Sequence, residues 1–351
     1  MFYTKILRPI FFKCNPEFMH DLMVLCGEVF GAFPPARWLI NLVWGYHGKD
    51  ISKIVDGIRF ERPILLSAGF DTDGRLSRIL SSVSFGGEEV GSVTARPCAG
   101  NAKPQLTRLV RNKSLVVWKG LKNDGARAIA RRLVHKKMTK GFVVGISIAQ
   151  TNDENVNNAE SGLDDYYETF KIMNEAGVGD YYTINISCPN TFGGETFATL
   201  ELLTRLLTRL ATVPCIEPRY VKMPINLAWE DFNKLLQIID KFGFNGVIIG
   251  NLNKKYSMLD FPEDAPKEWR GGLSGKPCFE LSNELIRRTR AEYGARFTII
   301  GSGGIFSPED AMAKFRAGAD LVQLITGMIF EGPGLVGRIC NAYATAKNLR
   351  I

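Results

Sequence analysis

Segments typical of strands and of helices alternate along the chain from Ile51 onward, and this alternation restricts the fold more than any other feature. Helical patterns lie between most of the expected strands, for example at 164–176, 228–242, 280–293 and 308–317. The expected strands are 64–67, 89–94, 143–148, 182–185, 220–222, 246–249, 298–301 and 321–324. About eight strand–helix units in roughly 300 residues favour a (β/α)8 TIM barrel over an open sheet. We therefore predict an α/β barrel over residues 49–351 and an N-terminal helical extension over residues 1–48.

Composition and charge exclude several functional classes. The formal charge of +8 suits an anionic ligand or an anionic membrane surface, but it is too small to require nucleic acid. The 7 cysteines include no C-x-x-C pair and the 3 histidines are dispersed, so we expect no metal site and a reducing compartment. We find no apolar run of about 18 residues and no typical signal peptide.

Residues 1–48 differ in character from the rest of the chain. Asn15 and Pro16 are typical of a helix start, and Pro34 with Pro35 ends that helix before a second apolar segment at 37–44. Short apolar helices with basic flanks are typical of segments that lie in a membrane interface without crossing it. A helical cap packed on its own domain and an oligomerisation surface are the alternatives.

The strand expected at 182–185 is followed by a thiol between two side-chain amides. Asn185 and Asn190 flank Cys188, and a proline and two glycines end the strand and open a loop. Amides offer paired donors and acceptors that suit a planar ring with alternating N–H and C=O groups. A thiol between them could exchange a proton with a carbon of that ring. A buried cysteine beside two turn-forming asparagines is the alternative interpretation.

The last two strands are followed by loops of small residues. Gly303 and Gly304 follow the strand at 298–301, Thr326 and Gly327 follow the strand at 321–324, and residues 270–276 form a third small-residue loop. TIM barrels commonly bind phosphate at the loops after strands seven and eight, where glycine lets backbone N–H groups approach an anion. Such loops are otherwise ordinary turns. Lys222 ends a buried strand and needs an anionic partner or an anionic cofactor ring.

These motifs, in this order and spacing, resemble those of the dihydroorotate dehydrogenase family, specifically its quinone-linked, membrane-associated class 2. The similarity extends over residues 1–343. It rests on Asn15 to Glu17 with His20 and on the motifs at 67–71, 91–97, 185–191, 271–276, 301–304 and 321–324.

The resemblance implies a single FMN in the barrel mouth. Lys222 would stabilise the negative charge that develops on the reduced flavin ring. The implied cofactor-binding residues are Ala68, Gly69, Ser92, Ser147, Lys222, Ser274, Gly275, Gly303, Gly304, Thr326 and Gly327.

The resemblance also implies the reaction. Dihydroorotate would be held by Asn185, Asn190 and Asn251, with Thr72 at a further substrate position, and Cys188 would act as the base. Electrons would pass to ubiquinone or menaquinone through a tunnel lined by His20 and Arg108. This chemistry belongs to pyrimidine biosynthesis, on the cytoplasmic face of the bacterial inner membrane or on the mitochondrial inner membrane.

Five positions depart from the class 2 pattern. Cys188 replaces the serine base, as in the soluble class 1 enzymes, and its thiol has a reference pKa nearer neutrality than a hydroxyl. Thr72 stands in place of a lysine, Val117 and Ser147 in place of asparagines, and Leu252 in place of a threonine.

The four other replacements remove groups that would pair with the charged and polar edge of orotate, and Lys119 or Lys122 could substitute for them. Three hypotheses follow. The chain is a diverged dihydroorotate dehydrogenase, an FMN oxidoreductase acting on another dihydropyrimidine or cyclic compound, or a flavoprotein that has lost turnover.

Overall fold

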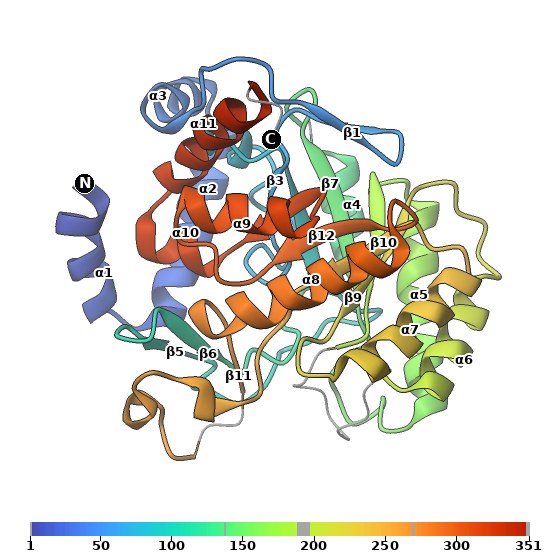
Figure 1. Ribbon diagram of the computed structural model, residues 1–351. Coiled ribbons are helices and arrows are strands. Elements are labelled where there is room, and N and C mark those ends of the chain that lie inside the picture. Colours follow the sequence, from blue (N-terminus) through green and yellow to red (C-terminus); the bar gives the residue numbers. More distant parts are fainter. Residues whose placement is uncertain (1, 137, 188–196, 269–270, 349–351) are drawn as a thin grey trace.

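The chain folds around a closed barrel of parallel strands (Figure 1). The computed structural model describes residues 2–136, 138–187, 197–268 and 271–348. Each barrel strand pairs with the next along the chain, and β13 closes the ring on β3. The strands are β3 (Ile64–Leu66), β4 (Gly87–Val93), β7 (Val143–Ile148), β8 (Tyr181–Asn185), β9 (Arg219–Met223), β10 (Gly246–Ile249), β12 (Thr298–Ser302) and β13 (Leu321–Leu324). The predicted barrel and all eight predicted strands are confirmed.

The barrel interior is a packed core at its N-terminal end. The rings of Tyr181 and Tyr220 meet edge to face, with centroids 5.2 Å apart. An antiparallel hairpin, β1 (Lys53–Val55) and β2 (Ile58–Phe60), places the fully buried Phe60 against this cluster. The hairpin therefore closes the barrel at the N-terminal ends of its strands, and the cavity lies at the opposite end.

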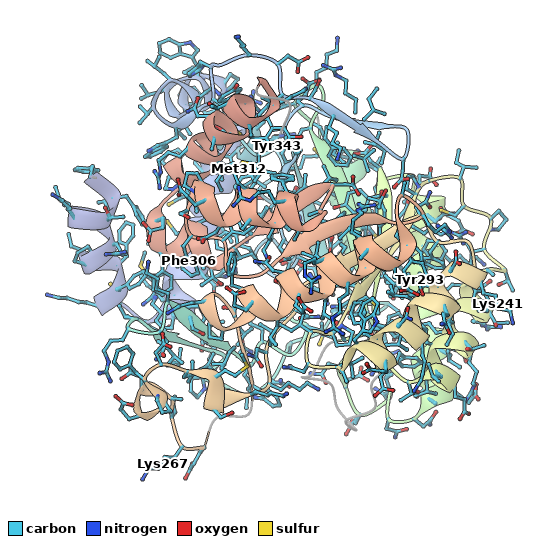
Figure 2. All side chains as sticks on the ribbon, viewed as in Figure 1. Lys241, Lys267, Tyr293, Phe306, Met312 and Tyr343 are labelled. Carbon is cyan, nitrogen blue, oxygen red and sulfur yellow. The ribbon has the colours of Figure 1, made fainter. Side chains whose placement is uncertain are left out.

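Helices cover the outside of the barrel: α4 (Ala126–Val134), α5 (Ala159–Glu175), α6 (Leu200–Leu210), α7 (Trp229–Lys241), α8 (Phe279–Tyr293), α9 (Pro308–Ala317), α10 (Thr326–Glu331) and α11 (Gly334–Asn348). Neighbouring helices are joined by specific contacts. Tyr293 on α8 donates a hydrogen bond to Asn233 on α7 (2.6 Å), and the ring of Tyr343 on α11 packs on Phe315 of α9. Figure 2 shows the side chains that fill the space around the barrel.

The N-terminal segment forms a π-helical turn, η1 (Tyr3–Leu7), and three helices, α1 (Arg8–Lys13), α2 (Pro16–Ala32) and α3 (Pro34–Trp44). The predicted start of α2 is confirmed, because the Asn15 side chain accepts hydrogen bonds from the backbone N–H groups of Glu17 and Phe18. These helices lie along one side of the barrel (Figure 1). Within the described ranges, no helix is both long and apolar enough to cross a bilayer.

A small antiparallel sheet, which the sequence did not predict, lies between the N-terminal helices and the barrel mouth. It consists of β5 (Leu106–Leu109), β6 (Ser114–Val117) and β11 (Gly272–Leu273). The short helical turns are η2 (Leu80–Val83), η3 (Tyr256–Met258), η4 (Pro262–Asp264) and η5 (Lys276–Cys278). Because Val117 pairs with Gly272, the end of β6 forms one wall of the mouth.

Candidate active site

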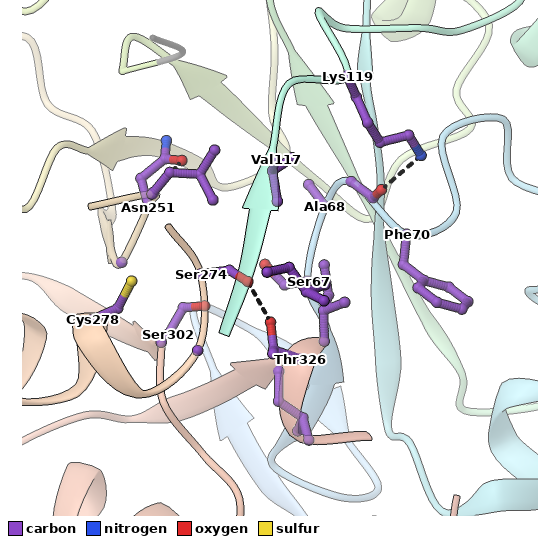
Figure 3. A pocket seen from close by; sticks show the side chains of 18 of the residues that line it. Ser67, Ala68, Phe70, Val117, Lys119, Asn251, Ser274, Cys278, Ser302 and Thr326 are labelled. Atoms are coloured by element: carbon purple, nitrogen blue, oxygen red, sulfur yellow. Dashed lines mark hydrogen bonds between the residues drawn. The ribbon is translucent and has the colours of Figure 1, made fainter. Parts of the chain in front are cut away.

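A cavity opens at the C-terminal ends of the barrel strands (Figure 3). The loop after β3 supplies Ser67 to Phe70 and Thr72, and the small sheet supplies Leu106, Leu115 and Val117. Predicted site residues that line the cavity are His20, Ala68, Gly69, Thr72, Ser92, Asn185, Lys222, Asn251, Ser274, Gly275, Gly303, Gly304, Thr326 and Gly327. Residues distant in the sequence thus meet in one place. Cys188 and Asn190 lie outside the described residues.

Two predicted residues lie just outside the cavity lining. Ser147 is fully buried on β7, and its hydroxyl is 3.0 Å from that of Ser92. Arg108 on β5 donates hydrogen bonds to the backbone carbonyls of Cys14 (2.7 Å) and Phe12 (3.4 Å). Its guanidinium also lies over the Phe12 ring, and burial lowers its pKa from the ordinary value. Arg108 therefore ties the small sheet to the N-terminal helices.

Glycines form a narrow cradle on the side of the cavity near β12 and α10. Gly275, Gly303 and Gly304 have φ of +77°, +97° and +76°, a conformation that L-residues with a side chain rarely adopt. A Cβ on Gly303 would come within 2.9 Å of Cys278 Cβ, and one on Gly304 within 2.5 Å of Phe279 Cβ. The hydroxyls of Ser274 and Thr326 meet at 2.8 Å beside them (Figure 3). Exposed backbone amides and two hydroxyls are a donor set that fits a phosphate.

A buried cation lines the same cavity. Lys222, only 5% exposed, donates a hydrogen bond to the Ser67 hydroxyl (3.4 Å). Its ammonium is 3.8 Å from Glu89 Oε1, and Glu89 Oε2 accepts a hydrogen bond from Gln323 (2.8 Å). The pair keeps a positive charge at the cavity floor without leaving it uncompensated. Sequence reasoning missed Glu89, because the chain offers two consecutive glutamates on one strand with no sign of which faces inward.

Two side-chain amides lie together on the opposite side of the cavity. Asn185 donates to the Ser92 hydroxyl (2.9 Å), and Asn251 donates to the Ser187 hydroxyl. The Nδ2 of Asn251 is 3.4 Å from Asn185 Oδ1. The Tyr166 hydroxyl donates to the Asn185 backbone carbonyl (2.7 Å) and fixes the end of β8. The two amides thus present donors and acceptors in a fixed arrangement.

The substituted positions make part of the cavity apolar. Val117 and Leu252 line it, and the Thr72 hydroxyl is already engaged with Asp73 Oδ2 at 2.8 Å. Cys278 also lines the cavity, where burial raises its thiol pKa to about 12. This thiol is therefore protonated at neutral pH.

Lys119 follows β6, lines the cavity and lies beyond Val117 at the end of that strand (Figure 3). Its ammonium is 3.4 Å from the Gly69 carbonyl and 3.4 Å from His20 Nε2. Burial lowers the pKa of Lys119 to about 8. His20 Nε2 is also 2.8 Å from the Phe70 carbonyl. Lys119 and Lys122, the two lysines suggested as substitutes for the missing polar groups, both line the cavity. The Lys119 ammonium lies near His20 Nε2 and points away from Asn251 (Figure 3).

Comparison with known proteins agrees with this arrangement. The family model described as dihydroorotate dehydrogenase matches residues 51–345. A protein of Cyanothece sp. named dihydroorotate dehydrogenase (quinone) is 32% identical, with 99% of this chain and 96% of that protein covered. One of the same name from Chelativorans sp. is 34% identical, covering 98% and 93%.

A solved structure has the same architecture. The crystal structure of Eimeria tenella DHODH in complex with ferulenol superposes with a TM-score of 0.82 at 25% sequence identity, covering 96% of this chain and 92% of that one. The family match over most of the barrel, the full-length relatives and the shared fold lead to one conclusion: this chain belongs to the dihydroorotate dehydrogenase family.

Proposed function

We propose that the protein oxidises dihydroorotate to orotate with a bound FMN and passes the electrons to a membrane quinone. One observation carries the proposal: a single cavity joins a glycine cradle, a buried lysine and a pair of side-chain amides. The names of the quinone-linked relatives support the substrate and the acceptor.

The residues present fit FMN. Gly275, Gly303, Gly304 and the hydroxyls of Ser274 and Thr326 would hold its phosphate, with Gly327 at the start of α10. Ala68, Gly69 and the Ser92–Ser147 pair would border the ring, with Lys222 at its edge. When bound, FMN supplies a two-electron carrier that exchanges electrons with both carbon substrates and quinones.

The amides would orient the substrate. Asn185 and Asn251 present donors and acceptors suited to the ring N–H and C=O groups of dihydroorotate, and Asn190 would add a third amide. The Cys188 thiolate would take the C5 proton, while two electrons and the C6 hydrogen leave to the cofactor. Thr72 would border the substrate through the network that it shares with Asp73.

The apolar wall favours a second candidate. Val117 and Leu252 replace polar groups, which suits a less charged dihydropyrimidine or another cyclic substrate of an FMN oxidoreductase. Anaerobic mixing of the flavoprotein with dihydroorotate and, separately, with uncharged dihydrouracil distinguishes the two. Bleaching by dihydroorotate at the lower concentration supports the proposal. Bleaching by dihydrouracil alone supports the second candidate, and no bleaching by a wider panel indicates a flavoprotein without turnover.

The N-terminal helices would serve the second half of the reaction. Residues 1–48 would form a membrane-docking and quinone-tunnel unit on the barrel of residues 49–351. Phe33, Trp38, Leu42 and Val43 are each more than half exposed, which supports docking on a bilayer. His20 on α2 lines the same cavity as the cradle, so an acceptor between α2 and the barrel would reach the cofactor, with Arg108 at its outer side. The protein would thus be peripheral to the bacterial or mitochondrial inner membrane.

A further inference from the structure

Lys119 is a half-buried lysine whose ammonium lies at the cavity wall. Its polar neighbours are the Gly69 carbonyl and His20 Nε2, both at 3.4 Å, and within the described part of the chain no carboxylate lies at ion-pair distance. A partly desolvated cation is costly unless it is paired. Because burial lowers its pKa to about 8, Lys119 carries a proton at neutral pH that it can release with little cost.

His20 connects this ammonium to solvent. Its Nδ1 is 3.1 Å from Asp21 Oδ1, and the Asp21 side chain is 66% exposed whereas that of His20 is 14% exposed. Burial, followed by the charge of Lys119, lowers the pKa of His20. Asp21, His20 and Lys119 thus form a continuous chain of titratable groups from the surface to the cavity wall.

The contacts of His20 restrict where its proton resides. A neutral imidazole carries one N–H. With the proton on Nδ1, His20 donates to Asp21, and Nε2 is free to accept from Lys119. With the proton on Nε2, it donates to the Phe70 carbonyl instead. If both ring nitrogens of His20 carried protons, the imidazolium would lie 3.4 Å from the Lys119 ammonium, and the two positive charges would repel each other. Lys119 and His20 therefore favour states in which they carry one positive charge between them, and the proton can pass from one to the other.

Other charged groups act on this pair from the elements around it. Asp21 on α2 and Asp71 and Asp73 in the loop after β3 favour the charged form of Lys119, whereas Lys122 in the loop after β6 opposes it. Asp73 itself has a pKa raised by burial. These opposing effects do not restore the ordinary pKa of Lys119, because desolvation is the largest cause.

We propose that Asp21, His20 and Lys119 form a proton path, with Lys119 donating to an oxygen of the quinone bound in the cavity. The path rests on the proposed function, in which a quinone accepts electrons here. A quinone becomes a quinol by gaining two electrons and two protons. The bound cofactor would supply the two electrons and one of the protons, so the protein has to supply one further proton. Lys119 supplies it and is reprotonated through His20 from solvent.

Stopped-flow reoxidation tests the path without using the substrate. The holoenzyme is reduced with dithionite and mixed with decylubiquinone between pH 6 and 9.5, in water and in heavy water. The reoxidation rate of wild type should fall as the pH rises through about 8, where Lys119 loses its proton, and the rate should be lower in heavy water than in water. Lys119→Met should be about 100-fold slower or more, with no break at that pH. Lys119→Arg should be equally slow because arginine keeps the charge but does not release its proton. Lys103→Met, at an exposed surface lysine, should match wild type.

Two outcomes would overturn the proposal. Reoxidation of Lys119→Arg at the wild-type rate would show that only the charge matters. If Lys119→Met weakens dihydroorotate binding and leaves the reoxidation rate unchanged, Lys119 instead binds the substrate carboxylate. Failure of dihydroorotate to bleach wild type would contradict the proposed function and leave the dithionite experiment valid.

A further measurement is independent of turnover. In an NMR titration of ¹⁵N-histidine, Lys119→Met should raise the His20 pKa, because a nearby like charge is removed. An unchanged His20 titration would show that the two groups are not coupled, which contradicts the path.

Discussion

Glu88 and Glu89 are consecutive residues of β4, both fully buried, and they face opposite sides of the strand. Glu89 points into the barrel, where Lys222 and Gln323 compensate it. Neither carboxyl oxygen of Glu88 has a hydrogen-bond partner among the residues that the structure describes. Burial and the charge of Asp71 raise the pKa of Glu88 well above its ordinary value. The same residue type thus lies beside a lysine and a glutamine at one position, and favours its neutral form at the neighbouring one.

Removing the charge of Glu89 should destabilise the protein. Glu89→Gln leaves Lys222 buried without its anion, which should lower the free energy of unfolding by about 3–5 kcal/mol. Urea denaturation measures this change. Glu168→Gln, which breaks an exposed pair with Arg127, is the control and should cost less than about 1 kcal/mol. Equal effects of the two substitutions would argue against a special role for the Glu89–Lys222 pair.

Glu88→Gln should have the opposite effect at neutral and alkaline pH. The folded-state pKa of Glu88 is raised, so its contribution to stability is full below the unfolded-state pKa of about 4.3 and is lost as the pH rises toward the folded-state value. The variant should therefore be more stable than wild type at pH 8, by about 1–3 kcal/mol, with the difference shrinking toward pH 4.5. Denaturation curves over this range provide the test, and a variant less stable at pH 8 would contradict it.

The glycine cradle should be required for flavin retention. Gly304→Ala places a Cβ 2.5 Å from Phe279 Cβ at a φ of +76°, so the cradle must distort and flavin content should fall. Gly243→Ala is a matched control, since its φ of +67° imposes similar backbone strain but its Cβ meets no atom within 4 Å. Flavin absorbance per protein is the readout. Loss of flavin in both variants would point to general destabilisation.

The exposed apolar side of α3 should drive membrane association. Trp38→Ser combined with Leu42→Ser removes side chains that are 68% and 58% exposed, so flotation with anionic liposomes should decrease. Ile216→Ser changes a residue that is 96% exposed elsewhere and should leave flotation unchanged. If the double variant floats with the liposomes to the same extent as wild type, the proposal that α3 docks on the membrane is wrong.

Cys188 should act only in the reduction of the flavin. Cys188→Ala should slow bleaching by dihydroorotate about 10²–10⁴-fold and leave reoxidation by quinone unaffected. Cys188→Ser should retain part of the rate at alkaline pH, because a hydroxyl has a higher pKa than a thiol and is less ionised at neutral pH. Single-turnover kinetics separate the two half-reactions, and an unaffected bleaching rate in Cys188→Ala would exclude it as the base.

The sequence predicted the barrel because its strands are short, mostly apolar segments that alternate with helical patterns. Strands such as Val143–Ile148 are buried along their whole length, and that pattern is readable without a structure. The small sheet escaped prediction, because β11 spans only Gly272–Leu273 and its register with Val117 depends on the tertiary fold. The β1–β2 hairpin is equally short, with three residues in each strand.

The sequence predicted many of the residues that line the candidate active site, but it did not predict which charged side chains lie close to one another there. Glycines at strand ends and Asn185 are visible in the chain, and the structure places them in one cavity. The directions of side chains are not visible. Nothing in the sequence distinguishes Glu88 from Glu89, or shows that the Lys119 ammonium meets His20, which is 99 residues away.

Anaerobic titration of the purified protein with dihydroorotate decides whether it is a flavin-dependent dihydroorotate dehydrogenase. We expect about one FMN per chain, loss of its visible absorbance on addition of dihydroorotate, and recovery of that absorbance with a short-chain ubiquinone. Protein that binds no flavin after reconstitution with FMN, or bound flavin that stays oxidised at millimolar dihydroorotate, would contradict the proposed function.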